Sequence, residues 1–140
     1  MLKEIVCIII GTIGALVTLA FGGWSTALIT LVWFMGLDFL LGLIVAGVFK
    51  RSKKSKTGKL SSTASWKGLA KKVVTLLFVS FAYRIDLLMN TTFLKDAVTI
   101  SFIVNEALSI CENAGLMGIP IPSVLSRAIE ALRKDNDNVQ

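Results

Sequence analysis

Long apolar stretches, separated by short polar breaks, dominate the hydrophobic pattern of this chain. Four of them cover residues 5–21, 27–49, 69–89 and 97–114. A helix rises about 1.5 Å per residue, so about 20 apolar residues are enough to cross the hydrocarbon core of a bilayer. The pattern therefore predicts an all-α integral membrane protein with about four transmembrane helices. Three spans are the alternative, because the segment 97–114 is the least apolar of the four.

The other residues form a polar connection and a carboxy-terminal segment. We predict a cytoplasmic loop at 50–68, a transmembrane domain over 1–115, and an elbow, an amphipathic helix and a polar cytoplasmic tail over 116–140. The elbow is rigid because Pro120 and Pro122 each fix the backbone angle φ. Apolar residues share one face of the helix that follows: Val124, Leu125, Ala128, Ile129 and Leu132. We expect this helix to lie along the inner membrane surface or to pack on a second subunit.

The first apolar stretch has some features of a secretory signal peptide. Its amino-terminal charge is weak, because Glu4 offsets Lys3, and no convincing small-residue cleavage site precedes Gly22. An uncleaved membrane span is the preferred interpretation.

The distribution of basic residues predicts the orientation of the chain in the membrane. The chain has 15 Lys and Arg residues against nine Asp and Glu. With the amino terminus inside and four spans, 13 of the 15 lie on the cytoplasmic side. Cytoplasmic loops of membrane proteins carry an excess of Lys and Arg. Both termini are therefore expected in the cytoplasm; with three spans the carboxy terminus would lie outside.

Charged residues inside the apolar stretches are candidates for function, because a charge at a helix centre costs roughly 2.5–3.5 kcal/mol on insertion scales. Asp38 lies near the middle of the second stretch, with Gly42 one turn further on the same face. Asp38 is predicted to act in oligomerisation or in a pore, or to be a buried partner of Arg84. Arg84 and Asp86 are two residues apart, face different sides of one helix, and are predicted to be interhelical or interfacial charges.

The fourth stretch carries a polar stripe. At 100° per residue, its polar residues fall within an arc of about 140°. They are Ser101, Asn105, Glu106, Ser109, Glu112 and Asn113. Because polar partners are scarce in the other stretches, the preferred interpretation is that the stripe lines an aqueous pore or lesion. A seam between helices and an interfacial position of the whole helix are the alternatives.

Basic residues cluster between the second and third stretches. They are Lys50, Arg51, Lys53, Lys54, Lys56, Lys59, Lys67, Lys71 and Lys72. Apart from Trp66 the cluster lacks aromatic residues on which bases could stack, so we expect no nucleic-acid partner. Its position beside two spans favours binding to anionic lipid headgroups. A role confined to setting the topology is equally compatible.

Composition argues against catalysis. Hydrophobic residues make up 54% of the chain and charged residues 17%, histidine is absent, and the two cysteines are too few for a four-thiolate zinc site. No Gly-rich phosphate loop and no pair of nucleophile and base are present. We expect no enzyme activity, no cofactor and no metal site.

The pattern NE-x-LSI-x-EN followed by G-x-P-x-P stands out in the second half of the chain. Its residues are Asn105-Glu106, Leu108-Ser109-Ile110, Glu112-Asn113, Gly118, Pro120 and Pro122, together with Asp38-Phe39-Leu40-Leu41-Gly42, Trp66-Lys67-Gly68 and Asp86 earlier in the chain. These motifs resemble those of the toxin-secretion/phage-lysis holin family, and the similarity covers about residues 30–134. Arg84 is not part of the pattern.

The resemblance implies a function in the bacterial cytoplasmic membrane. Such a protein oligomerises with copies of itself into lesions, which release an endolysin or assist export of a large toxin, without specific binding of that cargo. Two other classes fit the residues. One is a small ion channel or a proton-coupled multidrug-type transporter that uses Asp38 or Glu106. The other is a non-conducting membrane tether.

Overall fold

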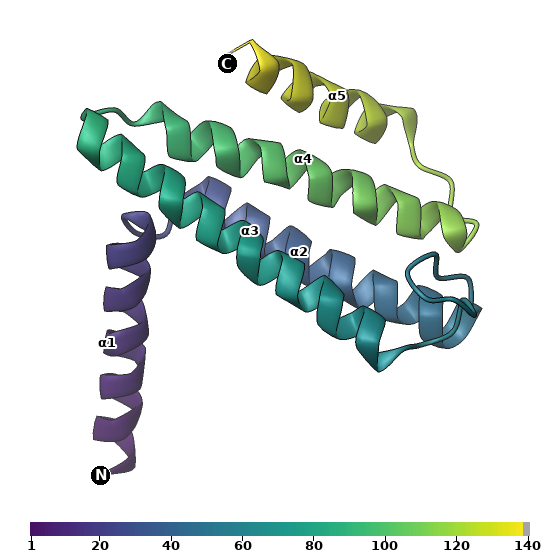
Figure 1. Ribbon diagram of the computed structural model, residues 1–140, viewed down its shortest axis with the longest axis horizontal. Coiled ribbons are helices and arrows are strands. Elements are labelled where there is room, and N and C mark those ends of the chain that lie inside the picture. The colour runs from purple at the N-terminus through teal and green to yellow at the C-terminus, as the bar shows by residue number, and fades with distance from the viewer. Residues whose placement is uncertain (139–140) are drawn as a thin grey trace.

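The computed structural model describes residues 1–138 and is helical throughout (Figure 1). No strand occurs among these residues. The last two residues of the predicted polar tail lie outside the described residues. The elements in chain order are α1 (Leu2–Phe21), α2 (Thr26–Ile44), the π-helical turn η1 (Val45–Phe49), α3 (Ser62–Met89), α4 (Phe93–Leu116) and α5 (Ser123–Asp137).

Helix α3 begins earlier than the apolar pattern predicts. It begins at Ser62 rather than at residue 69, because Ser61 caps it: the Ser61 Oγ accepts a hydrogen bond from the Ala64 amide at 3.4 Å. The basic connection is therefore shorter than expected. Lys67, predicted in the loop, lies on the helix, and Lys72 lies well inside it.

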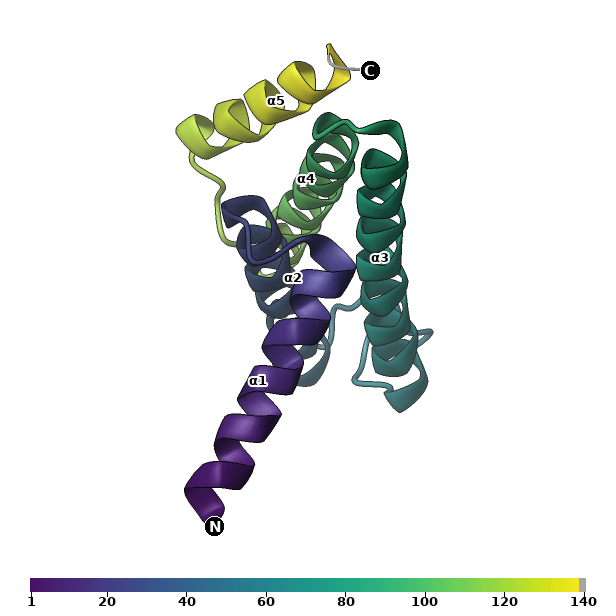
Figure 2. The ribbon, with the colours of Figure 1, turned by 90° about the vertical axis from the view of Figure 1, so that its left-hand side faces the viewer.

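Helices α2, α3 and α4 run side by side and form the core (Figures 1 and 2). Buried apolar side chains from all three helices meet there: Leu28, Leu31, Met35, Val79 and Ile103. This packing holds the polar residues of the three helices at fixed positions relative to one another.

Helix α5 folds back and runs antiparallel along α4 (Figures 1 and 2). Ile129 packs against Val104 and Ala107, and the Asn136 amide donates to the Ser101 hydroxyl at 2.5 Å. Within this chain the helix therefore packs on α4, and its position on the membrane surface or on a second subunit stays a prediction. The elbow after α4 reverses the chain and brings Ile129 of α5 onto α4, while Val124, Leu125 and Leu132 stay exposed.

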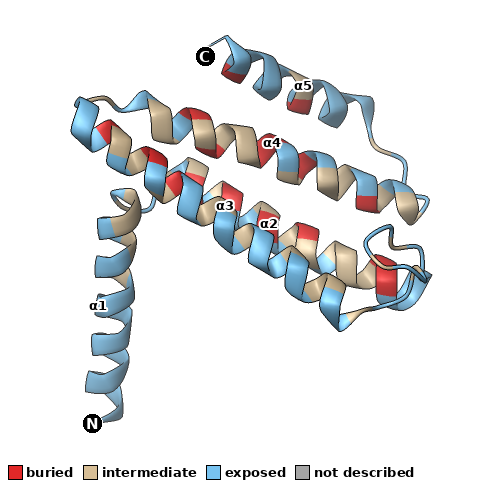
Figure 3. Cartoon of the chain, in the orientation of Figure 1, coloured by how far each residue is buried: buried red, intermediate tan, exposed pale blue. Residues whose placement is uncertain are grey.

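Helix α1 projects away from the other helices and touches them at its carboxy-terminal end (Figures 1 and 3). None of its residues is buried. Among residues 1–138, the helices long and apolar enough to cross a membrane are Leu2–Phe21 and Thr26–Phe49, the latter being α2 continued by η1. The structure thus confirms the all-helical fold and supports two membrane spans, while a count of four stays a prediction.

Candidate functional site

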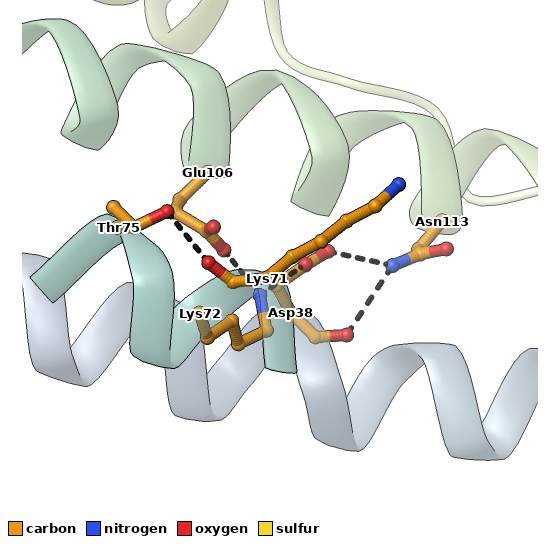
Figure 4. A network of polar contacts seen from close by, with 6 residues as sticks. All are labelled: Asp38, Lys71, Lys72, Thr75, Glu106 and Asn113. Carbon is orange, nitrogen blue, oxygen red and sulfur yellow. Dashed lines mark hydrogen bonds and ion pairs between the residues drawn. The ribbon is translucent and has the colours of Figure 1, made fainter. Parts of the chain in front are cut away.

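One lysine joins two carboxylates at the centre of the helical bundle (Figure 4). The Lys72 Nζ on α3 donates to the Asp38 Oδ2 on α2 at 2.8 Å and to the Glu106 Oε2 on α4 at 2.7 Å. The Asn113 amide on α4 donates to the Asp38 Oδ1 at 3.0 Å. These four residues, which we call the ion-pair network, connect all three helices of the core.

The ion-pair network corrects two predictions. The partner of Asp38 is Lys72, not Arg84. Lys72 itself was expected to contact lipid headgroups, but only 13% of its side chain is exposed. Lys72 lies on the face of α3 that meets α2 and α4, where its ammonium group reaches both carboxylates. Lys71, its neighbour, stays exposed, and its ammonium group lies apart from the carboxylates (Figure 4).

The ion-pair network contains one more negative than positive charge when all three groups are ionised. Removing a charge from water costs several kcal/mol, and the mutual attraction of a buried pair offsets this cost only in good geometry. Both Lys72 contacts have such geometry, and the Asn113 amide occupies a further lone pair of Asp38. Loss of Lys72 would leave two buried carboxylates facing each other, so it is the member on which the others depend.

Most members of the predicted polar stripe on α4 find partners within the chain. Glu106 and Asn113 belong to the ion-pair network, and Ser101 accepts from α5. Glu112 forms an exposed ion pair with Lys53 at 3.4 Å. The expectation that polar partners are scarce is therefore wrong. A pore-lining role of the stripe stays a prediction.

A cavity of about 390 Å³ opens beside the ion-pair network, between α2, the 50–61 connection, the start of α3, and α4. Its lining includes Asp38, Lys72 and Glu106, and also Asn105 and Ser109 of the stripe. Other predicted site residues meet there too: Gly42, Lys54, Lys59, Lys67 and Lys71. The predicted basic residues that do not line it are Lys50, Arg51, Lys53 and Lys56, which are exposed on the connection.

Arg84 on α3 contacts α1, so its position is interhelical, but its partner is a backbone carbonyl rather than Asp38. Its Nη2 donates to the Leu19 carbonyl at 2.9 Å, the Ser80 hydroxyl donates to the Ala20 carbonyl at 2.8 Å, and the Lys95 ammonium donates to the Phe21 carbonyl. The last carbonyls of a helix have no intrahelical partner and carry partial negative charge. These three donors therefore attach the end of α1 to α3 and α4. Sequence reasoning missed this role of Ser80 and Lys95.

A glycine allows the end of α1 to lie close against α3. Gly22 follows α1 with a φ of 78°, and a Cβ at this position would lie 2.7 Å from the Cε2 of Tyr83. Any other residue would meet both the unfavourable backbone conformation and the ring. The Gly22-Gly23 pair was the one sequence signal of a helix end here, but it does not reveal the donors.

Asp86 is buried and caps α4. It accepts hydrogen bonds from the Thr91 hydroxyl at 2.6 Å and from the amides of Leu94 and Lys95 at 3.1 and 2.8 Å. Its interhelical position agrees with the prediction. The cap also explains why α4 begins at Phe93 rather than at residue 97, because the carboxylate satisfies the first free amides of the helix.

The structure and the sequence define a small helical membrane protein. The chain belongs to the bacteriophage holin family, which matches residues 15–134. The resemblance inferred from the sequence motifs is thus confirmed. Family membership indicates a membrane protein without enzymatic activity. Among residues 1–138, no group of three or more His, Cys, Asp or Glu side chains is placed to hold a metal ion.

Individual relatives agree with the family. A probable holin of Bacillus phage phi105 is 33% identical over 102 residues, which cover 72% of this chain and 70% of the relative. An uncharacterized protein of Clostridium perfringens strain 13 is 32% identical over 137 residues, covering 95% and 96% of the two chains. One of Listeria monocytogenes is 37% identical over 119 residues, covering 83% and 78%. No solved structure matches the chain.

Proposed function

We propose that this protein acts as a holin. Copies of the chain oligomerise in the cytoplasmic membrane of a bacterial host and open lesions, through which an endolysin reaches the cell wall or a large toxin leaves the cell. The observation that carries the proposal is the family match over residues 15–134. A probable phage holin among the relatives supports it. The geometry adds support, because α4, which carries the polar stripe, packs beside α2, which is apolar enough to cross a membrane.

The described conformation suits a closed monomer. Glu106 and Asn113 turn inward to the ion-pair network, and Ser101 is covered by α5. The outer face of α5 carries charged residues, among them Arg133, which pairs with Glu130 at 2.9 Å. Such a face is costly in hydrocarbon. A crossing by α4 therefore requires α5 to leave it, which frees Ser101; Glu106 and Asn113 face water inside an oligomer only when the ion-pair network opens as well.

The orientation in the membrane is also part of the proposal. We place both termini in the cytoplasm, with several spans per chain. The 13 basic residues on that side support this placement, because translocating the nine between Lys50 and Lys72 would oppose the positive-inside rule.

The test is induced expression in bacteria, with viability, membrane potential and escape of a folded cytosolic reporter followed in one time course. A holin that opens large lesions gives a lag, then abrupt depolarisation together with reporter escape. Unimpaired growth with an intact potential, in cells where membrane fractionation confirms insertion, would overturn the proposal.

A second candidate is a small channel or a proton-coupled transporter. The observation in its favour is that two carboxylates, Asp38 and Glu106, line the same cavity. Intramembrane carboxylates of this kind mark ion and proton paths in transporters. Depolarisation without escape of the folded reporter would favour this candidate over a large lesion.

A further inference from the structure

We propose that the chain binds one anionic phospholipid in the cavity beside the ion-pair network, with the headgroup among four lysines and an acyl chain in an adjoining apolar groove. This inference goes beyond the proposed holin function and rests only on its membrane location. It differs from a general attraction of basic residues to anionic membranes, because it assigns the binding to particular residues.

The cavity has the charge of an anion site. Five lysines and two carboxylates line it, which leaves an excess of three positive charges. Lys72 is taken up by Asp38 and Glu106, so those two carboxylates are already paired. The four other lysines are exposed and, within the described residues, form no ion pair: Lys54, Lys59, Lys67 and Lys71.

The start of α3 reinforces this positive charge. Ser61, Ala64 and Ser65 line the cavity, so the first turn of a 28-residue helix borders it. The amino-terminal end of a helix carries partial positive charge, which favours phosphate groups, although the Ala64 and Ser65 amides are themselves bonded to Ser61. The Ser52 hydroxyl of the 50–61 connection lies in the same lining; it accepts from the Lys54 amide and keeps its own hydrogen for a ligand, whereas the Ser55 hydroxyl donates to the Lys59 carbonyl.

An apolar groove continues from the cavity. It holds about 370 Å³, and its lining shares Phe39, Leu43, Leu60 and Ser65 with the cavity. Ser62, Trp66 and Leu69 complete it. Tryptophan is enriched where hydrocarbon meets headgroups. A soluble phosphate compound would leave this groove unused, whereas a phospholipid fills both spaces. The chemistry of the two linings together therefore favours a lipid.

The experiment measures lipid retained by the purified full chain in detergent, by native mass spectrometry, on titration with phosphatidylglycerol or phosphatidylcholine. We expect one phosphatidylglycerol per chain, bound about tenfold more tightly than phosphatidylcholine. The triple variant Lys59→Gln/Lys67→Gln/Lys71→Gln should lose this preference. The matched control is Lys50→Gln/Arg51→Gln/Lys56→Gln, which removes the same charge from residues outside the cavity and should keep it.

Diffuse attraction predicts a different result. If each basic residue near the surface contributed equally, at about 1 kcal/mol, both triple variants would weaken binding alike. That outcome would overturn the proposal. So would equal affinity of the wild-type chain for phosphatidylglycerol and for soluble glycerol phosphate, which would assign the cavity to a free phosphate compound.

The groove is tested by substitutions of exposed residues that do not disturb the core. Leu60→Ser should weaken phosphatidylglycerol binding, whereas Leu87→Ser, which changes a leucine of similar exposure (53% against 58%) outside the groove, should leave it unchanged. Equal binding by both variants would contradict the acyl-chain part of the proposal. Because lipid retention is measured without lysis, a chain that lyses cells but retains no lipid overturns this inference alone.

Discussion

Two neighbouring lysines on α3 show how strongly position within a helix decides the role of a residue. Lys71 and Lys72 have the same chemistry, but a helix turns each residue about 100° from the one before it. Lys72 therefore meets Asp38 and Glu106 inside the bundle, while Lys71 is exposed and lines the mouth of the cavity. One is a structural cation and the other is available to a ligand.

Substitution of Lys72 should destabilise the bundle. Lys72→Met keeps most of the length of the side chain but leaves Asp38 and Glu106 without a counter-ion, and breaking a buried pair in this way costs about 3–5 kcal/mol. Lys71→Met is the matched control and should cost less than about 0.5 kcal/mol, as exposed substitutions do. Denaturant unfolding in detergent micelles, followed by circular dichroism, measures both. Equal effects of the two variants would contradict the prediction.

A rescue separates the charge effect from lost packing. In the Lys72→Met background, Asp38→Asn together with Glu106→Gln removes the unpaired charges and should recover about half or more of the lost free energy of unfolding. No recovery would mean that Lys72 acts through packing alone. In otherwise native chains, Asp38→Asn and Glu106→Gln should each alter the onset of lysis, and unchanged onset in both would remove these residues from assembly.

Whole helices were largely predictable from the sequence, because long apolar stretches and amphipathic periods persist over many residues. Their ends were less so. The start of α3 depends on Ser61, one of several serines in a polar connection, and only the local backbone selects it as the cap. The start of α4 depends on Asp86, which precedes the helix and belongs to another one.

The candidate site was predicted in its members but not in its pairings. Asp38 and Glu106 were identifiable because a carboxylate in an apolar stretch is expensive wherever it lies. Their partner was not, since the choice between Arg84 and Lys72 depends on how α2 and α3 align. The attachment of Arg84 to the Leu19 carbonyl was likewise hidden, because a backbone acceptor leaves no mark in the sequence.

The capping of α4 by Asp86 gives a prediction for that element. Asp86→Ala removes the acceptor of three hydrogen bonds and should lower the free energy of unfolding by about 2 kcal/mol, at the upper end for a helix cap. Asp96→Ala is the matched control, because Asp96 lies exposed in the first turn of the same helix. It should cost about 1 kcal/mol or less. Thermal unfolding in micelles compares them, and a control as costly as Asp86→Ala would argue against the cap.

The whole molecule places its polar and apolar groups as a lipid-facing protein requires. The buried polar and charged side chains include Asp38, Asp86 and Asn113, whereas α1 exposes almost all of its apolar side chains (Figure 3). Within residues 1–138, no buried side-chain nitrogen or oxygen lacks a hydrogen-bond partner. Hydrocarbon offers no hydrogen bonds, so internal satisfaction of this kind is what a bilayer demands.

Helix α5 departs from this lipid-facing arrangement, because its outer face is charged. Its contact with α4 therefore leads to a prediction for the whole assembly. Ile129 is 9% exposed and packs on Val104 and Ala107. Burial of such a side chain contributes roughly 1.5–3 kcal/mol, so Ile129→Asp should shift the balance toward released α5 by more than about tenfold. If release of α5 precedes the opening of lesions, this variant lyses cells earlier than the native chain.

The matched control for this variant is Val124→Asp, which introduces the same charge on the same helix at a side chain that is 69% exposed. It should leave the onset of lysis unchanged. Both variants are compared at equal abundance in the membrane fraction, with depolarisation recorded over time, so that loss of protein is not mistaken for delay. The same onset for both would mean that α5 stays on α4 when lesions form. A later onset for Ile129→Asp would mean that contact between α5 and α4 promotes assembly, because the oligomer then depends on the very packing that the substitution removes.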